Sequence, residues 1–296
     1  MNDDVLSQAA GRCIARNETE YASAAAVAAF SVAATLVFAC IAGSATAEPL
    51  RILCDVPNAL LTLNGRLDTT LSRLKSHAPL RVLAIGSSST EGVGASSPQA
   101  AYPARLQTEL QNRFKNQPVE VVNRGVSGEV VTATAERLRT EVEALKPSLV
   151  VWQVGTNDAL RGVSSEVFAD TLRNGLGWLA ERRIDVVLMD PQFFPKVAGS
   201  SAYASYVDGI STLAEVARTP VLHRYAAMRY WSDRPEGVRT PMLAADGFHM
   251  NDQGHACVGA MLAEAILRRT EPREPAVAGG AGALPQVALV KPGTAQ

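Results

Sequence analysis

One histidine of the chain has neighbours that could support catalysis by a serine. The four histidines are His77, His223, His249 and His255. Among them, His249 has Asp246 three residues earlier, in a loop that also contains Gly247. This spacing lets the carboxylate hold one ring nitrogen while the other ring nitrogen faces a hydroxyl. A serine hydroxyl needs such a neighbouring base to become a useful nucleophile.

Three further segments could complete such a site. They are residues 86–92 (GSSSTEG), 123–129 (NRGVSGE) and 155–158 (GTND). Their glycines let backbone N–H groups approach a substrate oxygen, and the amide of Asn157 can add a side-chain donor. Together these groups would form an oxyanion hole, in which losing one donor typically costs about 10²–10³ in rate.

Each of these three segments follows a short apolar run that predicts a buried strand. The predicted strands cover residues 81–85, 119–122, 149–154 and 185–189, with a shorter one at 221–223. Helical spacing predicts helices over 102–114, 130–145, 164–182, 203–218 and 252–268. Pro103 suits a first helical turn, Pro147 marks a helix stop, and Ser164 or Ser165 can serve as an N-cap.

The alternation of strands and helices predicts the fold class. Strands that are apolar nearly throughout are typical of a parallel sheet covered on both faces. We therefore expect a doubly wound α/β domain, a flavodoxin-like three-layer sandwich with a parallel sheet of about five strands. Ligands of such sheets bind beyond the carboxyl ends of the strands, where the segments described above begin.

In order and spacing, these segments resemble the four sequence blocks of the SGNH (GDSL-type) hydrolase superfamily, over about residues 81–268. By this resemblance the nucleophile is Ser88, and its partners are Asp246 and His249. The oxyanion hole then consists of the Ser88 and Gly128 backbone N–H groups and the Asn157 amide. The resemblance implies ester hydrolysis through an acyl-enzyme, with no metal and no organic cofactor. The chain departs from the family pattern in one respect, since Ser87 stands where an aspartate often precedes the nucleophile.

Other sequence features bear on the pocket and on rival chemistries. Residues 190–195 follow the fourth predicted strand, so they could line the pocket with Gln192 as a polar substrate contact, or form only a proline-rich turn. The sequence lacks the Gly-x-Ser-x-Gly elbow of ordinary α/β-hydrolases. It also lacks a Gly-x-x-x-x-Gly-Lys phosphate loop, a His-Glu-x-x-His motif and a Cys-x-x-Cys motif.

The composition excludes several protein classes. The chain has 296 residues, 28 Lys+Arg against 29 Asp+Glu, and 47% hydrophobic residues. This near-neutral charge argues against a nucleic-acid partner bound through a broad basic face. The apolar content suits a large core rather than a disordered chain.

The N-terminal segment predicts export. No charged residue lies between Glu20 and Glu48, and the Ala-rich run ends in residues 45–47 (ATA), a pattern that export peptidases cut after. The segment fits a cleaved signal peptide or a retained membrane anchor, and Cys40 offers lipidation as a third interpretation. A cleaved enzyme would be periplasmic or secreted, whereas a retained segment would tether it to the membrane, facing outward.

These features divide the chain into three parts. We predict a signal peptide or anchor over residues 1–47, a hydrolase domain over 48–269, and a flexible tail rich in Pro, Gly and Ala over 270–296. Cleavage would leave two cysteines, Cys54 and Cys257. They are either a disulfide formed in an oxidising compartment or two unrelated buried thiols.

The sequence thus predicts an exported serine esterase. We expect it to act on a small-molecule or polysaccharide ester with short acyl chains or O-acetyl groups, because no long apolar insertion indicates a lipase lid. Two alternatives remain: an O-acyltransferase that passes the acyl group to an envelope polysaccharide, and a non-catalytic envelope-binding protein of the same fold.

Overall fold

The computed structural model describes residues 54–235 and 241–269. The predicted leader at residues 1–47 and the predicted tail at 270–296 lie outside the described residues. Within them, five strands form one parallel sheet in the order β2-β1-β3-β4-β5. The strands are β1 (Leu80–Gly86), β2 (Val119–Gly125), β3 (Leu149–Gln153), β4 (Asp185–Met189) and β5 (Val221–Leu222). The predicted doubly wound α/β class is confirmed.

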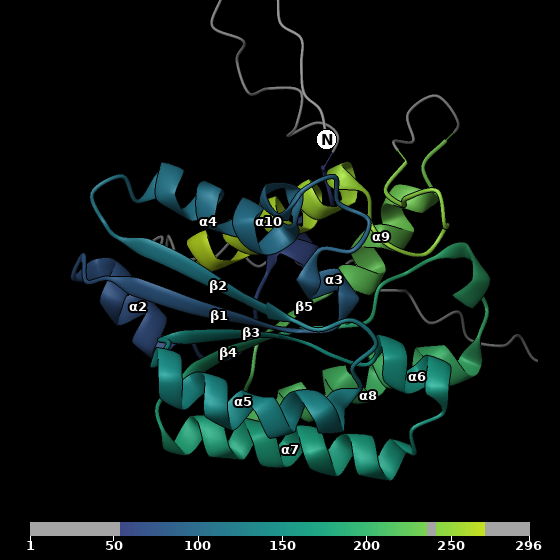
Figure 1. Ribbon diagram of the computed structural model, residues 1–296, viewed down its shortest axis with the longest axis horizontal. Helices are drawn as coiled ribbons and strands as arrows, with labels where there is room; N and C mark the ends of the chain where they lie inside the picture. The colour runs from purple at the N-terminus through teal and green to yellow at the C-terminus, as the bar shows by residue number, and fades with distance from the viewer. Residues whose placement is uncertain (1–53, 236–240, 270–296) are drawn as a thin grey trace, which may run out of the picture. The chain divides into compact units, whose positions relative to one another are not determined.

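Helices cover both faces of this sheet (Figure 1). On one side lie α3 (Ser88–Glu91), α4 (Tyr102–Arg113), α9 (Arg224–Ser232) and α10 (Asp252–Leu267). On the other lie α5 (Val131–Leu145), α6 (Thr156–Arg161), α7 (Ser165–Glu181) and α8 (Ser201–Ala217). The remaining helices are α2 (Asp68–Lys75) and the 3-10 turns η1 (Asn58–Leu61), η2 (Pro98–Ala100) and η3 (Pro195–Val197).

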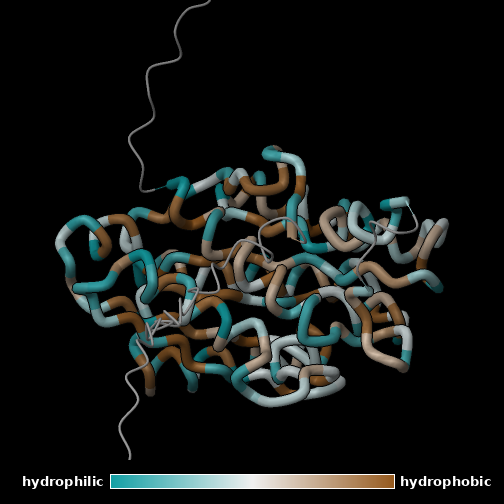
Figure 2. The backbone as a smooth tube through the Cα atoms, turned by 90° about the horizontal axis from the view of Figure 1, so that it is seen from above, coloured by the Kyte–Doolittle hydropathy of each residue, from teal (hydrophilic) through white to brown (hydrophobic). Residues whose placement is uncertain are grey.

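Alternate residues of each strand build two hydrophobic cores. Val82 and Val151 point toward the α4 and α10 side, whereas Leu83, Val150 and Trp152 point toward α5, α7 and α8. All five residues are fully buried. Because both sheet faces are covered, the strands contain no regular polar alternation, and this is why they could be recognised as apolar runs. In Figure 2 hydrophobic and hydrophilic residues alternate along the helical turns, as amphipathic helices require.

A disulfide joins the start of the described chain to the last helix. Cys54 and Cys257 are bonded with a Cα–Cα distance of 5.0 Å. Of the two alternatives for these cysteines, a disulfide or two unrelated thiols, the structure has the disulfide. The bond anchors the segment before η1 to α10, which begins three residues after His249.

Candidate active site

The nucleophile predicted from the sequence lies at the carboxyl edge of the central strand β1. Ser87 is the N-cap of α3, and Ser88 is its first helical residue. The order β2-β1-β3 places this helix between the segments that leave β2 and β3. The first three predicted segments therefore converge because their strands are neighbours in one parallel sheet.

A continuous chain of hydrogen bonds runs from Ser88 to Asp246. The Nε2 atom of His249 lies 3.1 Å from the Ser88 hydroxyl oxygen. Its Nδ1 atom lies 2.6 Å from Oδ2 of Asp246. Ser88 is 8% exposed, whereas the side chains of His249 and Asp246 are 19% and 48% exposed. The serine is thus recessed, and the carboxylate faces solvent.

Hydrogen bonds within the loop of His249, from both its backbone and the Asp246 side chain, hold the loop closed. Leu243 and Met250 form an antiparallel bridge. Oδ1 of Asp246 accepts the N–H groups of Phe248 at 2.9 Å and of His249 at 3.0 Å. Two hydrogen bonds hold the pKa of Asp246 below its usual value. The one from the His249 ring contributes most, and the one from the Phe248 N–H contributes less. The carboxylate therefore stays ionised and fixes the orientation of the imidazole.

The structure places Gly128 on the loop between β2 and α5, and Asn157 in the first turn of α6. Gly128 has a φ of +79°, which favours glycine. The N–H groups of its neighbours are engaged, since Ser127 donates to Glu91 and Glu129 donates to the Val126 carbonyl. Within residues 54–235 and 241–269, no acceptor takes the Gly128 N–H. Asn157 donates from Nδ2 to the Glu129 carbonyl at 2.8 Å, and the second hydrogen on Nδ2 stays available.

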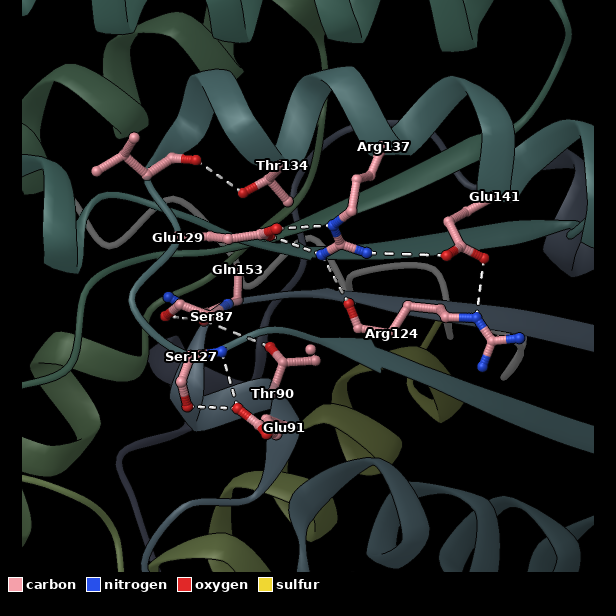
Figure 3. Close-up of polar contacts among 12 residues, drawn as sticks. Ser87, Thr90, Glu91, Arg124, Ser127, Glu129, Thr134, Arg137, Glu141 and Gln153 are labelled. Atoms are coloured by element: carbon pink, nitrogen blue, oxygen red, sulfur yellow. Dashed lines mark hydrogen bonds and ion pairs between the residues drawn. The ribbon is translucent and has the colours of Figure 1, made fainter.

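Gln153 anchors the turn before the nucleophile, a role that the sequence does not reveal. Its Oε1 accepts both the backbone N–H of Ser87 at 2.9 Å and the Ser87 hydroxyl at 3.0 Å (Figure 3). A Cβ on Gly86 would lie 2.8 Å from this amide oxygen, so only glycine fits there. Gln153 ends β3, where the apolar run indicates only sheet packing.

Gln192 lies under the site rather than at its surface. It is 1% exposed. Its Oε1 accepts the Ser89 hydroxyl at 2.8 Å, and its Nε2 donates to the Phe248 carbonyl at 2.9 Å. The side chain thus braces the nucleophile helix against the histidine loop. This burial disfavours the predicted substrate contact, because both ends of the amide already have protein partners.

Asp158 ties the Asn157 segment to the helix that follows the Gly128 loop. Its carboxylate accepts the N–H of Val131 at 2.8 Å and that of Gly155 at 3.2 Å. Burial raises the pKa of Asp158, while these hydrogen bonds oppose the rise. The side chain thus braces the start of α6 against the start of α5.

The described part of the chain contains neither a cluster of metal-ligand side chains nor a helix suited to span a membrane. Over residues 54–235 and 241–269, no three His, Cys, Asp or Glu side chains cluster as metal ligands would. No helix in the same ranges is long and apolar enough to cross a membrane.

The model of the non-GDSL lipase-like family matches residues 53–272. The chain belongs to this family. It is a carboxylic ester hydrolase, and the resemblance to GDSL and SGNH hydrolases is confirmed. No curated protein matches this family member by sequence.

Solved structures share the fold of this family member. A two-domain esterase active on acetylated mannans matches with 20% identity and a TM-score of 0.58, over 73% of this chain and 59% of that chain. A variant of Axe2, an acetyl xylan esterase from Geobacillus stearothermophilus, matches with 24% identity and a TM-score of 0.55, over 64% and 96%. The lipase/acylhydrolase from Enterococcus faecalis matches with 23% identity and a TM-score of 0.54, over 66% and 100%.

Proposed function

We propose that the protein is an exported serine esterase that removes short acyl groups, such as O-acetyl groups, through an acyl-enzyme. The observation that carries the proposal is the hydrogen-bonded chain Ser88–His249–Asp246. A serine, an imidazole and a carboxylate in this order form the constellation of acyl transfer.

In the first half-reaction the Ser88 oxygen attacks the ester carbonyl carbon, and His249 Nε2 takes the hydroxyl proton. Asp246 stabilises the imidazolium through Nδ1, at 2.6 Å. The tetrahedral intermediate collapses as the bond to the alcohol oxygen breaks and His249 returns the proton to that oxygen. The alcohol leaves, and the acyl group remains on Ser88.

In the second half-reaction His249 takes a proton from water, and the hydroxide attacks the acyl carbon. The carboxylic acid leaves, and the Ser88 oxygen recovers its proton. In both steps negative charge develops on the carbonyl oxygen. Three donors would stabilise it: the Ser88 N–H in the first turn of α3, the Gly128 N–H and the second Nδ2 hydrogen of Asn157.

Two observations support the substrate class and the location. Structures with the same fold include one esterase active on acetylated mannans and one acetyl xylan esterase. Disulfides such as Cys54–Cys257 persist in oxidising compartments, which agrees with the export predicted from the N-terminal segment. We therefore propose an O-acetylated polysaccharide or a short-chain ester as substrate, outside the cytoplasm.

The test compares Ser88→Ala with the matched variant Ser89→Ala on p-nitrophenyl acetate. We expect Ser88→Ala to lose at least about 10³-fold in kcat. Ser89→Ala should stay within about tenfold, because the Ser89 hydroxyl bonds to Gln192 and not to His249. Circular dichroism checks the fold of both variants.

Labelling and product analysis separate the alternatives. A fluorophosphonate should modify the wild-type protein at Ser88, and an unlabelled protein would indicate a non-catalytic binding role. With a sugar acceptor present, free acid indicates a hydrolase and a new sugar ester indicates an acyltransferase. Undiminished turnover by Ser88→Ala would overturn the mechanism.

A further inference from the structure

We propose that Glu91 and Arg137 are positioning residues, which clamp the loop around Gly128 so that its free N–H group stays aligned with the nucleophile. The inference rests on the proposed function and adds two charged side chains that touch neither Ser88 nor His249. Glu91 bonds to the loop from α3 and Arg137 bonds to it from α5, on opposite sides of the loop (Figure 3).

Glu91 connects the nucleophile helix to the residue before Gly128. It is the last residue of α3, the four-residue helix that begins with Ser88. Its Oε2 atom accepts the backbone N–H of Ser127 at 2.8 Å and also the Ser127 hydroxyl. Because one short helix carries both Ser88 and Glu91, this carboxylate sets the distance from the nucleophile to the loop.

The loop also packs directly on the backbone of α3. A Cβ on Gly125 would lie 2.0 Å from the backbone nitrogen of Glu91, so only glycine permits this approach. The Val126 N–H donates to the Gly86 carbonyl at 3.0 Å, and Asn123 Nδ2 donates to the Glu91 carbonyl at 3.3 Å. A displacement of the loop is therefore transmitted to the nucleophile turn.

Arg137 holds the opposite side of the loop from α5. Its Nε and Nη2 atoms bond to the two carboxylate oxygens of Glu129 at 2.7 and 2.6 Å. The Nη2 atom also donates to the carbonyl of Arg124 at 3.1 Å. One guanidinium thus joins the chain before the loop to the chain after it. A lysine could not make this bidentate pair with a carboxylate.

Partial burial and a neighbouring pair reinforce this grip. The side chains of Glu129 and Arg137 are 12% and 28% exposed. Glu141 lies 3.8 Å from Arg137 and bonds to Arg124 at 2.8 Å. Solvent therefore screens the Glu129–Arg137 pair less than a surface ion pair.

The two clamps leave Gly128 as the one residue between fixed neighbours. Glu91 fixes Ser127, and Arg137 fixes Glu129, whose carbonyl also receives the Asn157 amide. The φ of +79° at Gly128 then sets the direction of its N–H group, which has no acceptor in the described chain. Because a misplacement of about 1 Å can cost about 10²-fold in rate, holding this N–H matters for the chemical step rather than for substrate binding.

The first test is a series at Glu91, measured with p-nitrophenyl acetate. We expect Glu91→Ala to lower kcat about 10- to 100-fold, with KM changed less than about threefold. Glu91→Gln should stay within about threefold of the wild type, because its amide oxygen can still accept the Ser127 N–H. Glu91→Asp should lose as much activity as Glu91→Ala, because the aspartate side chain is one methylene shorter and does not reach Ser127. If the alanine variant does not fold, Glu91→Asp replaces it in the test.

The matched control is Glu120→Ala, which breaks an ion pair to Arg81 at the opposite end of β2. It should leave kcat and KM unchanged. Equal loss in Glu91→Gln and Glu91→Ala would overturn the hydrogen-bond role, and so would a wild-type kcat in both Glu91→Ala and Glu91→Asp.

The second test combines the two clamps. We expect Arg137→Met to lower kcat about tenfold or more, and the double variant with Glu91→Ala to be about as slow as the slower single variant, since both act through one loop. Fully multiplicative losses would overturn the shared-loop inference. Ser88→Ala, assayed in parallel, separates the two proposals: activity in that variant refutes the serine mechanism, whereas its inactivity beside unaffected clamp variants refutes only the clamp.

Discussion

Removing the Cys54–Cys257 disulfide should lower the stability of the protein while sparing its chemistry. The two cysteines are 203 residues apart in sequence, so the bond closes a loop that contains nearly the whole domain. The chain-entropy relation gives about 5 kcal/mol for a loop of this length, and measured disulfides typically contribute about 2–4 kcal/mol. For the double variant Cys54→Ser/Cys257→Ser we therefore expect the free energy of unfolding to fall by about 2–5 kcal/mol.

Urea unfolding followed by tryptophan fluorescence measures this loss. With a slope of about 2–3 kcal/mol per molar urea, the midpoint should fall by roughly 1–2 M. The wild type under reducing conditions should resemble the double variant, and the reductant should not affect the variant itself. Turnover of p-nitrophenyl acetate at low temperature should be unchanged, because the only described side chain that bonds to either sulfur is Gln253. An unchanged midpoint in both the variant and the reduced wild type would refute the reasoning.

Two further predictions follow from single residues. Gly128→Ala should lower the free energy of unfolding by about 1–2 kcal/mol because of the positive φ at this position, and it should lower kcat about 10²-fold. The control is Gly199→Ala, at a φ of +77° with open space around it. It should lower the free energy of unfolding by a similar amount and leave kcat unchanged. Burial lowers the pKa of His255 to about 4, so as pH falls below 6.5 the unfolded chain binds a proton before the folded one. Stability should therefore fall between pH 6.5 and 4, by up to about 3 kcal/mol, and urea midpoints of His255→Gln should lack this part of the acid loss.

The sheet and its main helices could be predicted because burial leaves a pattern in the sequence. All five strands and the helices α4, α5, α7, α8 and α10 lie where apolar runs and helical spacing place them. The pattern fails for α2, whose sequence DTTLSRLK has few apolar residues. That helix is fixed from outside, since the backbone N–H of Thr70 donates to Asp185 at 2.6 Å. The helix α9 follows β5 directly and begins with the fully buried Arg224, which no hydrophobic pattern marks as a core residue.

The active site likewise contains some residues that the sequence predicts and others that it does not. Spacing indicates the Asp246–His249 pair because both residues lie in one short loop, and a parallel sheet accounts for its approach to Ser88. The braces could not be predicted, because each joins segments far apart in the chain. Gln192, for example, bonds to Ser89 across 103 positions and to Phe248 across 56. A glutamine after a strand carries no periodic signal, so only the folded arrangement reveals its partners.

The serine at position 87 suits its buried surroundings. Ser87 and Gln153 are 4% and 2% exposed, so an aspartate at position 87 would bring a charge into a nearly dry environment. The serine donates its N–H and hydroxyl to a neutral amide oxygen instead, and this holds the turn without a buried charge. The turn therefore needs a hydrogen-bonded backbone before Ser88, and the Ser87–Gln153 pair supplies it.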